Sequence, residues 1–477
     1  MDKSLLPKPV PRRVLTAIVI AWLALSVGVA WAVGIPYGLF LAWAGIASAV
    51  FVVHPFAGTL GLVVLNIVAA DWGQAFVLFP GHLYTINQAG MANLVMTGLA
   101  ALYILRRRPK LAPLTAPFAA FLTTGLLSIP FSSSPFAGLR EWTRMLPLAA
   151  LYVVAADLFR GAPSRARTWI WAIVASSVWP AIVSVYQGLT NRGYHTFRDD
   201  FTSNRLLGTL AHPITYGTYL GIIVLLALYL LRDADGARTR TSCAAYAMLN
   251  LALLFLTYSR GPSLAMIGAL VVLGLLARRE ARRVRGAVWV LAAVFLAANL
   301  LWGYTGDLSR AEMTMTAVEI EPLPETALGT PTSAPAAQGF TSFAWRLNLW
   351  RFALDLALER PLLGLGLGGF SDQSPRLVGF PVTPHNDFVR VFVEMGILGL
   401  GAFLWLWGAL AWRLGRFWRH AADRRQSLLA ATLGAVAAGY LMNCLAADML
   451  NNPTAGWVFW PLMALPEAFA PKTGAQG

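Results

Sequence analysis

The sequence predicts an all-α polytopic membrane protein with about 12 to 14 transmembrane helices. Of its 477 residues, 57% are hydrophobic and only 12% are charged, and apolar runs of about 17 to 22 residues recur along the chain. A helix of that length crosses roughly 30 Å of hydrocarbon. The runs do not alternate apolar with polar residues, as the strands of a membrane barrel do, so helices are expected to satisfy the backbone in lipid.

The apolar runs give the expected transmembrane helices in chain order. They cover residues 14–33, 36–54, 56–70, 90–105, 112–130, 143–158, 168–188, 212–231, 243–258, 262–277, 286–303, 386–411, 427–446 and 455–470. The shorter runs near the N-terminus also fit re-entrant segments, which sets the lower limit of 12 helices.

The basic residues predict the topology of these helices. A net charge of +15 would favour a nucleic-acid partner in a soluble protein. Here, however, most of the 37 Lys and Arg residues lie in clusters beside the apolar runs, at 3–13, 106–110, 160–167, 232–240, 278–285 and 413–425. Placing the N-terminus inside puts every cluster on the cytoplasmic side, as the positive-inside rule requires. We therefore expect no nucleic-acid partner.

This topology divides the chain into five parts. They are a cytoplasmic tail at 1–13, a helix bundle at 14–303 with an outer loop at 189–211, a large outer loop at 304–384, C-terminal transmembrane helices at 385–470 and a cytoplasmic tail at 471–477. The basic and then apolar N-terminus lacks a small-residue cleavage site, so the first helix is expected to stay uncleaved. Cys243 and Cys444 lie in apolar runs, which does not indicate a disulfide framework.

The large outer loop changes composition along its length. Residues 314–339 are rich in Pro, Thr, Ala and Glu and are expected to lack regular structure. Farther on, apolar residues recur at helical spacing, which predicts an amphipathic helix on the outer membrane surface. These residues are Trp345, Leu349, Phe352, Leu356 and Leu358. A glycine-rich run at 364–369 then leads to a histidine.

Two arginines are candidate anion-binding residues at outer helix ends. Arg260 lies in the short turn 258–262 between two apolar runs. An arginine fixed there cannot move its charge far, so we expect it to pair with an anion. Arg205, in the outer loop, offers the planar fork that suits phosphate oxygens. The alternatives are an internal salt bridge or interfacial anchor for Arg260 and an ordinary loop arginine for Arg205.

His385 is the candidate base. It stands where the large outer loop re-enters the membrane, and a neutral imidazole there can accept a proton from a hydroxyl. The alternative is a capping or interfacial histidine without a catalytic role. His212 and His195 are weaker candidates, because His212 precedes Pro213 in a helix-entry pattern and His195 lies within the outer loop.

The other charges near His385 do not indicate a metal site. Asp387, Arg390 and Glu394 recur at i, i+3 and i+7, so they share a helix face and are expected to pair with one another. The histidines are scattered and the outer segments hold no Asp-x-Asp pair. We therefore expect arginines, rather than a metal, to stabilise any anionic leaving group.

Four blocks in this order resemble the O-antigen ligase and polymerase superfamily of bacterial envelope glycosyltransferases. The first runs from Asn204-Arg205 through Gly208-Thr209 and His212-Pro213, where the family often has Asn-Pro, to Tyr216-Gly217. The second is Ser259-Arg260-Gly261. The third is Arg346 with Trp350 and the run 361–369. The fourth is His385-Asn386 with Glu394-x-Gly396-x-x-Gly399. The first 200 residues are similar to the family only in being polytopic.

The resemblance implies an enzyme that moves a glycan from undecaprenyl diphosphate at the periplasmic face of the bacterial inner membrane. It implies an inverting mechanism that uses neither metal nor cofactor. By position, His385 would activate the acceptor hydroxyl, Arg205 and Arg260 would bind the diphosphate, and Arg346 would help shape the donor site.

The resemblance leaves the acceptor open. We expect lipid A-core, as for an O-antigen ligase; the alternative is a lipid-linked repeat, as for an O-antigen or exopolysaccharide polymerase. A protein O-oligosaccharyltransferase ranks lower, because such relatives carry a large soluble domain after the histidine block, where two expected helices and a short tail follow here. A lipid or sugar transporter ranks last, because no internal repeat is apparent.

Overall fold

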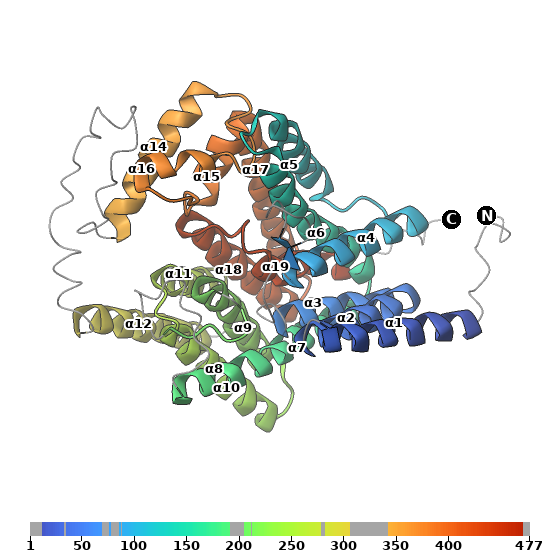
Figure 1. Ribbon diagram of the computed structural model, residues 1–477. Helices are drawn as coiled ribbons and strands as arrows, with labels where there is room; N and C mark the ends of the chain where they lie inside the picture. The colour runs from blue at the N-terminus through green and yellow to red at the C-terminus, as the bar shows by residue number, and fades with distance from the viewer. Residues whose placement is uncertain are drawn as a thin grey trace, which may run out of the picture.

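The chain folds into a bundle of helices (Figure 1). The computed structural model describes residues 12–32, 35–68, 76–77, 85–86, 88–190, 205–210, 212–277, 282–305 and 342–470. Six of the described helical segments are long and apolar enough to cross a membrane, and six further apolar helices are shorter. The predicted fold class, an all-α polytopic membrane protein, is confirmed. The exact count of 12 to 14 crossings stays a prediction.

The described elements follow one another along the chain. They are α1 (Arg12–Ala32), α2 (Ile35–Val53), α3 (Pro55–Val68), β1 (Phe76–Val77), β2 (Thr85–Ile86), α4 (Gln88–Arg107), α5 (Thr115–Ser128), η2 (Ile129–Phe131), α6 (Pro135–Phe159), α7 (Pro163–Ser176), α8 (Val178–Thr190), α9 (Pro213–Asp233), α10 (Ala237–Leu256), α11 (Arg260–Leu276), α12 (Arg282–Thr305), α14 (Ser342–Glu359), α15 (Phe370–Gln373), α16 (Pro375–Val378), α17 (Asp387–Arg419), α18 (Arg424–Ala446), α19 (Pro453–Met463) and η4 (Leu465–Phe469). The two strands form a minimal antiparallel pair, Phe76 opposite Ile86.

Each expected span coincides with a helix or with two consecutive helices. The span expected at 168–188 breaks into α7 and α8 at Ser177. Pro180 has no N–H to donate to the carbonyl four residues earlier, which weakens the helix at that point. The Ser177 hydroxyl bonds the Val174 carbonyl at 2.8 Å and the Tyr246 hydroxyl at 2.7 Å, so the break is tied to a neighbouring helix.

Helix α9 forms the centre of one half of the bundle. It packs against α10, α11 and α18, and 78% of its most apolar stretch is buried. An aromatic cluster joins α17, α18 and α19, where Tyr440 stacks on Phe459 at 4.0 Å between ring centroids. Because lipid is as apolar as these side chains, close packing rather than exclusion from water holds the helices together.

The glycine-rich run docks into a break in α17. Gly396 has φ 64°, outside the helical region, and the chain there opens to admit the run. Ile397 donates its N–H to the Pro361 carbonyl at 2.8 Å, and Leu365 donates to the Val393 carbonyl at 2.8 Å. A Cβ on Gly364 would lie 2.5 Å from the Val393 oxygen, so only glycine permits this approach. The Glu-x-Gly motif of α17 and the glycine-rich run thus bind each other through their backbones.

Helix α14 packs on the protein with the face that was expected to lie on the membrane. Leu349 and Leu356 are buried in a small core with Val393 of α17, which corrects the expected orientation. Leu358 of the expected stripe is nevertheless exposed (69%), as are Leu354 (41%) and, just beyond the helix, Leu362 (65%). In Figure 1, α14 lies beside the first turns of α17 at one end of the bundle.

Candidate active site

The predicted site residues gather at one end of the helix bundle. His212 caps the start of α9, Arg260 begins α11, and His385 lies two residues before α17. The short link between α18 and α19, residues 447–452, reaches the same place. The opposite ends of α9 and α17 carry Arg232, Arg416 and Arg419. The polar cluster therefore lies at the ends of these two helices that are away from their basic residues.

His385 is paired with a buried carboxylate. Its Nδ1 lies 3.0 Å from Oδ2 of Asp448, which is 5% exposed, whereas the His385 side chain is 36% exposed. Thr383 donates its hydroxyl to the same carboxylate oxygen. Burial alone would raise the pKa of Asp448, but the hydrogen bond and charge of His385, followed by the charge of Arg390, lower that pKa below its ordinary value. Asp448 is therefore an anion that fixes the Nδ1 edge of the imidazole.

The backbone at His385 is strained and supported from both sides. Its φ of 54° lies in the left-handed region, which costs about 1–3 kcal/mol for a residue other than glycine. On one side, Asn386 caps α17 by accepting from the backbone N–H groups of Phe388 (2.9 Å) and Val389 (3.2 Å). On the other, Trp350 of α14 donates its indole N–H to the Pro384 carbonyl at 2.7 Å. These contacts hold the imidazole in one orientation.

Arg205 is joined to the turn that precedes Arg260. Its Nε donates to the Thr257 carbonyl at 3.0 Å and its Nη2 donates to the Ser259 hydroxyl at 2.6 Å. The segment after Arg205 is fixed in turn by Gln187 of α8, whose Oε1 accepts from the Gly208 N–H at 3.0 Å. Two sequence blocks that lie about fifty residues apart thus form one structural unit.

Arg260 and Arg346 have side chains that are less fully engaged. Arg260 is exposed at the start of α11 and makes no hydrogen bond or ion pair with the described residues. Arg346 of α14 is partly buried, and its Nε has no hydrogen-bond partner among them. Burial lowers the pKa of Arg346, and the carboxylate of Asp448 opposes that change. A buried guanidinium N–H without a partner is unfavourable unless an acceptor binds, so Arg346 can receive an anion. Arg260 can receive one because its side chain is exposed.

His212 lies within reach of the same charges. Its Nδ1 accepts from the Ile214 N–H at 3.1 Å, which caps α9. Burial, with the positive charges of Arg205 and His385, lowers the pKa of His212 to about 4, and Asp448 opposes this shift. His212 is therefore neutral near pH 7. The helix-entry role predicted for it is what the structure shows.

The charges expected to pair on α17 do so only in part. Arg390 is buried and its Nε lies 3.1 Å from Glu394, as expected for an i, i+4 pair. Its Nη2 also lies 3.1 Å from Glu141 of α6. Asp387 does not join this network; its carboxylate accepts from the backbone N–H groups of Met449 and Leu450 at 3.1 and 3.3 Å.

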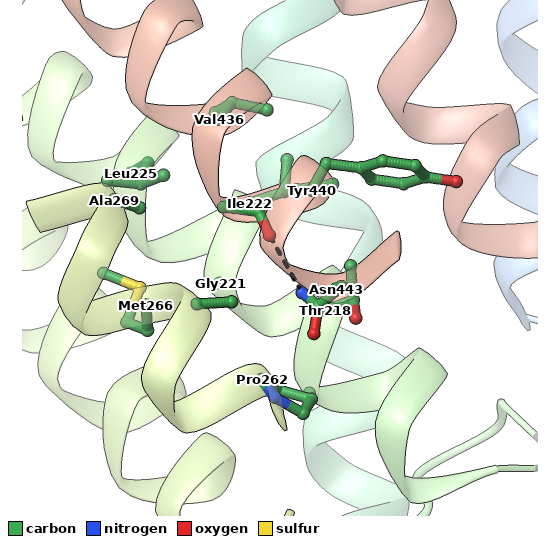
Figure 2. A pocket seen from close by; sticks show the side chains of 13 residues that line it. Thr218, Gly221, Ile222, Leu225, Pro262, Met266, Ala269, Val436, Tyr440 and Asn443 are labelled. Atoms are coloured by element: carbon green, nitrogen blue, oxygen red, sulfur yellow. Dashed lines mark hydrogen bonds between the residues drawn. The ribbon is translucent and has the colours of Figure 1, made fainter. Parts of the chain in front are cut away.

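A small cavity lies beneath the turn that carries Arg260. Figure 2 shows it between α9, α11 and α18, with Thr218, Pro262, Met266 and Asn443 around it. Asn443 donates to the Gly439 carbonyl at 3.2 Å. A volume of about 20 Å³ suits one water-sized molecule and excludes a sugar ring or a diphosphate. The candidate site is therefore the polar cluster at the helix ends.

Sequence reasoning missed Asp448 and Thr383. No motif marks Asp448, which follows His385 by 63 positions, and only the packing of α17 on α18 brings the two together. Thr383 lies beside His385 in sequence, but nothing there indicates that its hydroxyl meets a carboxylate. His195, with most of the loop 189–211 and residues 314–339, lies outside the described residues.

Comparison with known proteins gives the same family as the motifs. Residues 245–404 match the family model described as O-Antigen ligase. A protein of Rickettsia typhi is 27% identical over 224 residues, which cover 39% of this chain and 52% of that protein. A protein of Rickettsia prowazekii is 33% identical over 76 residues, or 14% of this chain and 19% of that protein. Both are named, provisionally, as polysaccharide ligases.

The alignments span at most about half of the length of these relatives. The matched region nevertheless includes Arg260, Arg346, His385 and the contact between the glycine-rich run and Gly396, and it excludes Arg205 and Asp448. The family match and these relatives support a resemblance of residues 245–404 to the O-antigen ligase superfamily.

Proposed function

We propose that this protein is an O-antigen ligase-like glycosyltransferase that moves a glycan from undecaprenyl diphosphate to a lipid A-core acceptor. The observation that carries the proposal is the His385–Asp448 pair, which stands at the same helix ends as the unit of Arg205 and the Arg260 turn. The relatives, which are named as polysaccharide ligases, favour a ligase over a polymerase.

His385 acts as the general base. Because Nδ1 faces the Asp448 carboxylate, Nε2 is the atom that accepts the proton of the acceptor hydroxyl. The hydroxyl oxygen then bonds the anomeric carbon while the bond from that carbon to the diphosphate oxygen breaks. Attack opposite the leaving group inverts the anomeric centre. Asp448 stabilises the imidazolium that forms.

The arginines bind the diphosphate and stabilise the charge that it gains on leaving. Arg260 is exposed and extends from a turn that is braced by Arg205. Arg346 brings a partly buried guanidinium whose Nε has no partner among the described residues. Charge-assisted hydrogen bonds from guanidinium groups to phosphate oxygens are strong and directional. Because a diphosphate is already a good leaving group, we propose that these contacts suffice without a metal or cofactor.

The site faces the periplasm in this proposal. The polar cluster lies at the starts of α9 and α17, whose opposite ends carry Arg232, Arg416 and Arg419. Basic residues favour the cytoplasmic side of the inner membrane. The protein would then have both termini in the cytoplasm and would receive donor and acceptor, both lipid-anchored, from the outer leaflet.

The test supplies purified protein with an undecaprenyl-diphosphate-linked glycan and either lipid A-core or a second lipid-linked repeat. The proposal predicts glycan transfer to lipid A-core, in the presence of EDTA as well as in its absence. Chain lengthening of the lipid-linked repeat without transfer to lipid A-core would identify a polymerase. Transfer to a serine or threonine peptide alone would identify a protein glycosylase. Transport of the intact donor without any transfer would refute the enzymatic proposal.

His385→Ala and Arg260→Ala should each abolish transfer in protein that still inserts into membranes. His385→Gln is the matched variant for the base, because its amide nearly fills the space of the imidazole but cannot take up a proton. Full activity of either histidine variant would exclude His385 as the base.

A further inference from the structure

We infer that Asp387, Arg390 and Asn451 form a clamp that positions Asp448 against His385. The inference rests on the proposed role of His385 as the base. None of the three is proposed to touch substrate; they act by fixing the link between α18 and α19, on which Asp448 lies. We call this set of residues the loop clamp.

Residues at the start of α17 and just before it contact four successive residues of the link, 448 to 451. Ahead of α17, Thr383 and His385 contact the carboxylate of Asp448 itself. The carboxylate of Asp387 then accepts from the N–H groups of residues 449 and 450, at 3.1 and 3.3 Å. One turn farther along, Arg390 donates Nη1 to Oδ1 of Asn451 at 2.6 Å. Base and carboxylate are therefore held by contacts between the same two segments.

The clamp is anchored in the interior of the protein. Arg390 is 2% exposed and also contacts Glu394 and Glu141, each at 3.1 Å. Arg144 and Arg140 contact the second oxygen of Glu141 at 2.7 and 3.6 Å, so three arginines share its negative charge. A buried arginine held by two carboxylates has one orientation, because each lost contact would leave a buried charge unpaired. The Nη1 group of Arg390 is therefore held in one position, from which it donates to Asn451 of the link.

The need for such a clamp follows from the position of Asp448. Asp448 lies in a non-helical link of six residues, which has no helical hydrogen bonds to fix it. A carboxylate that orients a base must stay within a few tenths of an ångström of its place. The left-handed φ of His385 is a second sign that the surroundings determine this geometry, because such strain persists only where neighbouring contacts enforce it.

Asn451→Ala is the sharpest test, because it removes the contact from Arg390 to the link and leaves every buried ion pair intact. We expect kcat to fall about tenfold, the size of one hydrogen bond to a charged group, while KM for the donor changes less than about twofold. Asn451→Asp keeps an acceptor for Arg390 and should recover most of the activity. The matched control is Asn93→Ala, which removes a 2.9 Å hydrogen bond to Trp457, away from the clamp, and should leave kcat of the folded protein unchanged.

A double-mutant cycle with Asp448→Asn separates positioning from general stability. If Asn451 acts through Asp448, then Asn451→Ala should lower kcat less than about threefold in protein that already carries Asp448→Asn. An equal, tenfold loss in both backgrounds would overturn the inference. A change confined to KM for the donor would also overturn it.

A readout without substrate keeps this inference separate from the proposed function. The protein has six histidines, so labelling with ¹⁵N-histidine allows the Nδ1 proton of His385 to be followed by NMR and assigned with the His385→Gln variant. The wild type should show a strongly downfield, slowly exchanging Nδ1 proton; Asn451→Ala and Asp387→Asn should each broaden it or speed its exchange. Unchanged signals in both variants would refute the clamp even if glycan transfer is confirmed. Conversely, absence of transfer by the wild type with an intact Nδ1 signal would refute the proposed function alone.

Discussion

Replacing Asp448 by asparagine tests the proposed base most directly. The asparagine side chain has nearly the same volume, but it lacks the charge and can turn its NH2 group toward His385. An asparagine in that orientation favours the tautomer with Nδ1 as acceptor and the proton on Nε2, so the tautomer that can take a proton from the acceptor hydroxyl becomes less populated. The 3.0 Å contact with a carboxylate that is 5% exposed is a charge-assisted hydrogen bond, whose loss costs about 1.5–3 kcal/mol.

That energy corresponds to a decrease of about 10- to 150-fold in kcat. The assay measures transfer from lipid-diphosphate-linked glycan at saturating acceptor, with kcat and the donor KM determined separately. The donor KM should change little, because the arginines remain. Thr383→Val is the matched control: it removes the other donor to the same carboxylate oxygen but keeps the anion beside His385, and it should lower kcat less than tenfold. Wild-type kcat in Asp448→Asn, or an equal loss in Thr383→Val, would refute the assigned roles.

Four other predictions test the site and its scaffold. Arg260→Lys keeps the charge but loses the planar fork, and should lower kcat/KM for the donor by about tenfold or more in steady-state assays. Burial holds the pKa of His212 at about 4 rather than 6.5. Between these two pH values the unfolded chain binds more protons than the folded protein, so the free energy of unfolding falls as the pH drops. His212→Gln should lessen the loss of thermal stability from pH 7 to pH 5, by no more than about 2 kcal/mol. Gly396→Ala, at φ 64° and with a Cβ 2.3 Å from the Leu362 backbone, should destabilise the protein by at least about 2 kcal/mol in thermal unfolding, whereas Gly401→Ala, which meets nothing within 4 Å, should not. A fluorophore on Leu358→Cys should be quenched by lipids labelled near the headgroup, and lack of quenching would exclude membrane contact by the outer side of α14.

Most of the membrane-spanning helices could be predicted because their sequences contain long apolar runs. The failures have local physical causes. The prediction missed the first turns of α6 because Arg140, Glu141 and Arg144 make that segment polar in sequence. In the structure, Glu141 is buried and pairs with arginines, which removes the cost of its charge. Hydropathy has no means of recognising charges that neutralise one another across helices.

The orientation of α14 shows a similar limit. Its periodicity correctly predicted a helix, but a stripe of apolar residues fits lipid and protein equally well. The structure distinguishes them through Val393 of α17, which packs with Leu349 and Leu356. Two leucines of α14 stay exposed: Leu358, which belongs to the expected stripe, and Leu354, which sequence spacing does not single out.

Some residues of the candidate site could be predicted from local sequence motifs, and others depend on packing between segments that are distant in sequence. His385, Arg205 and Arg260 were predicted, because each stands in a short block with a recognisable local geometry. Asp448 was not, because its role depends on how the link after α18 meets the start of α17. The contacts of Asp387 with the backbone of that link show why no side-chain pattern marks it: the link is recognised through its N–H groups, which every residue but proline has. A carboxylate that orients a base can therefore be found from structure where sequence motifs identify only the base.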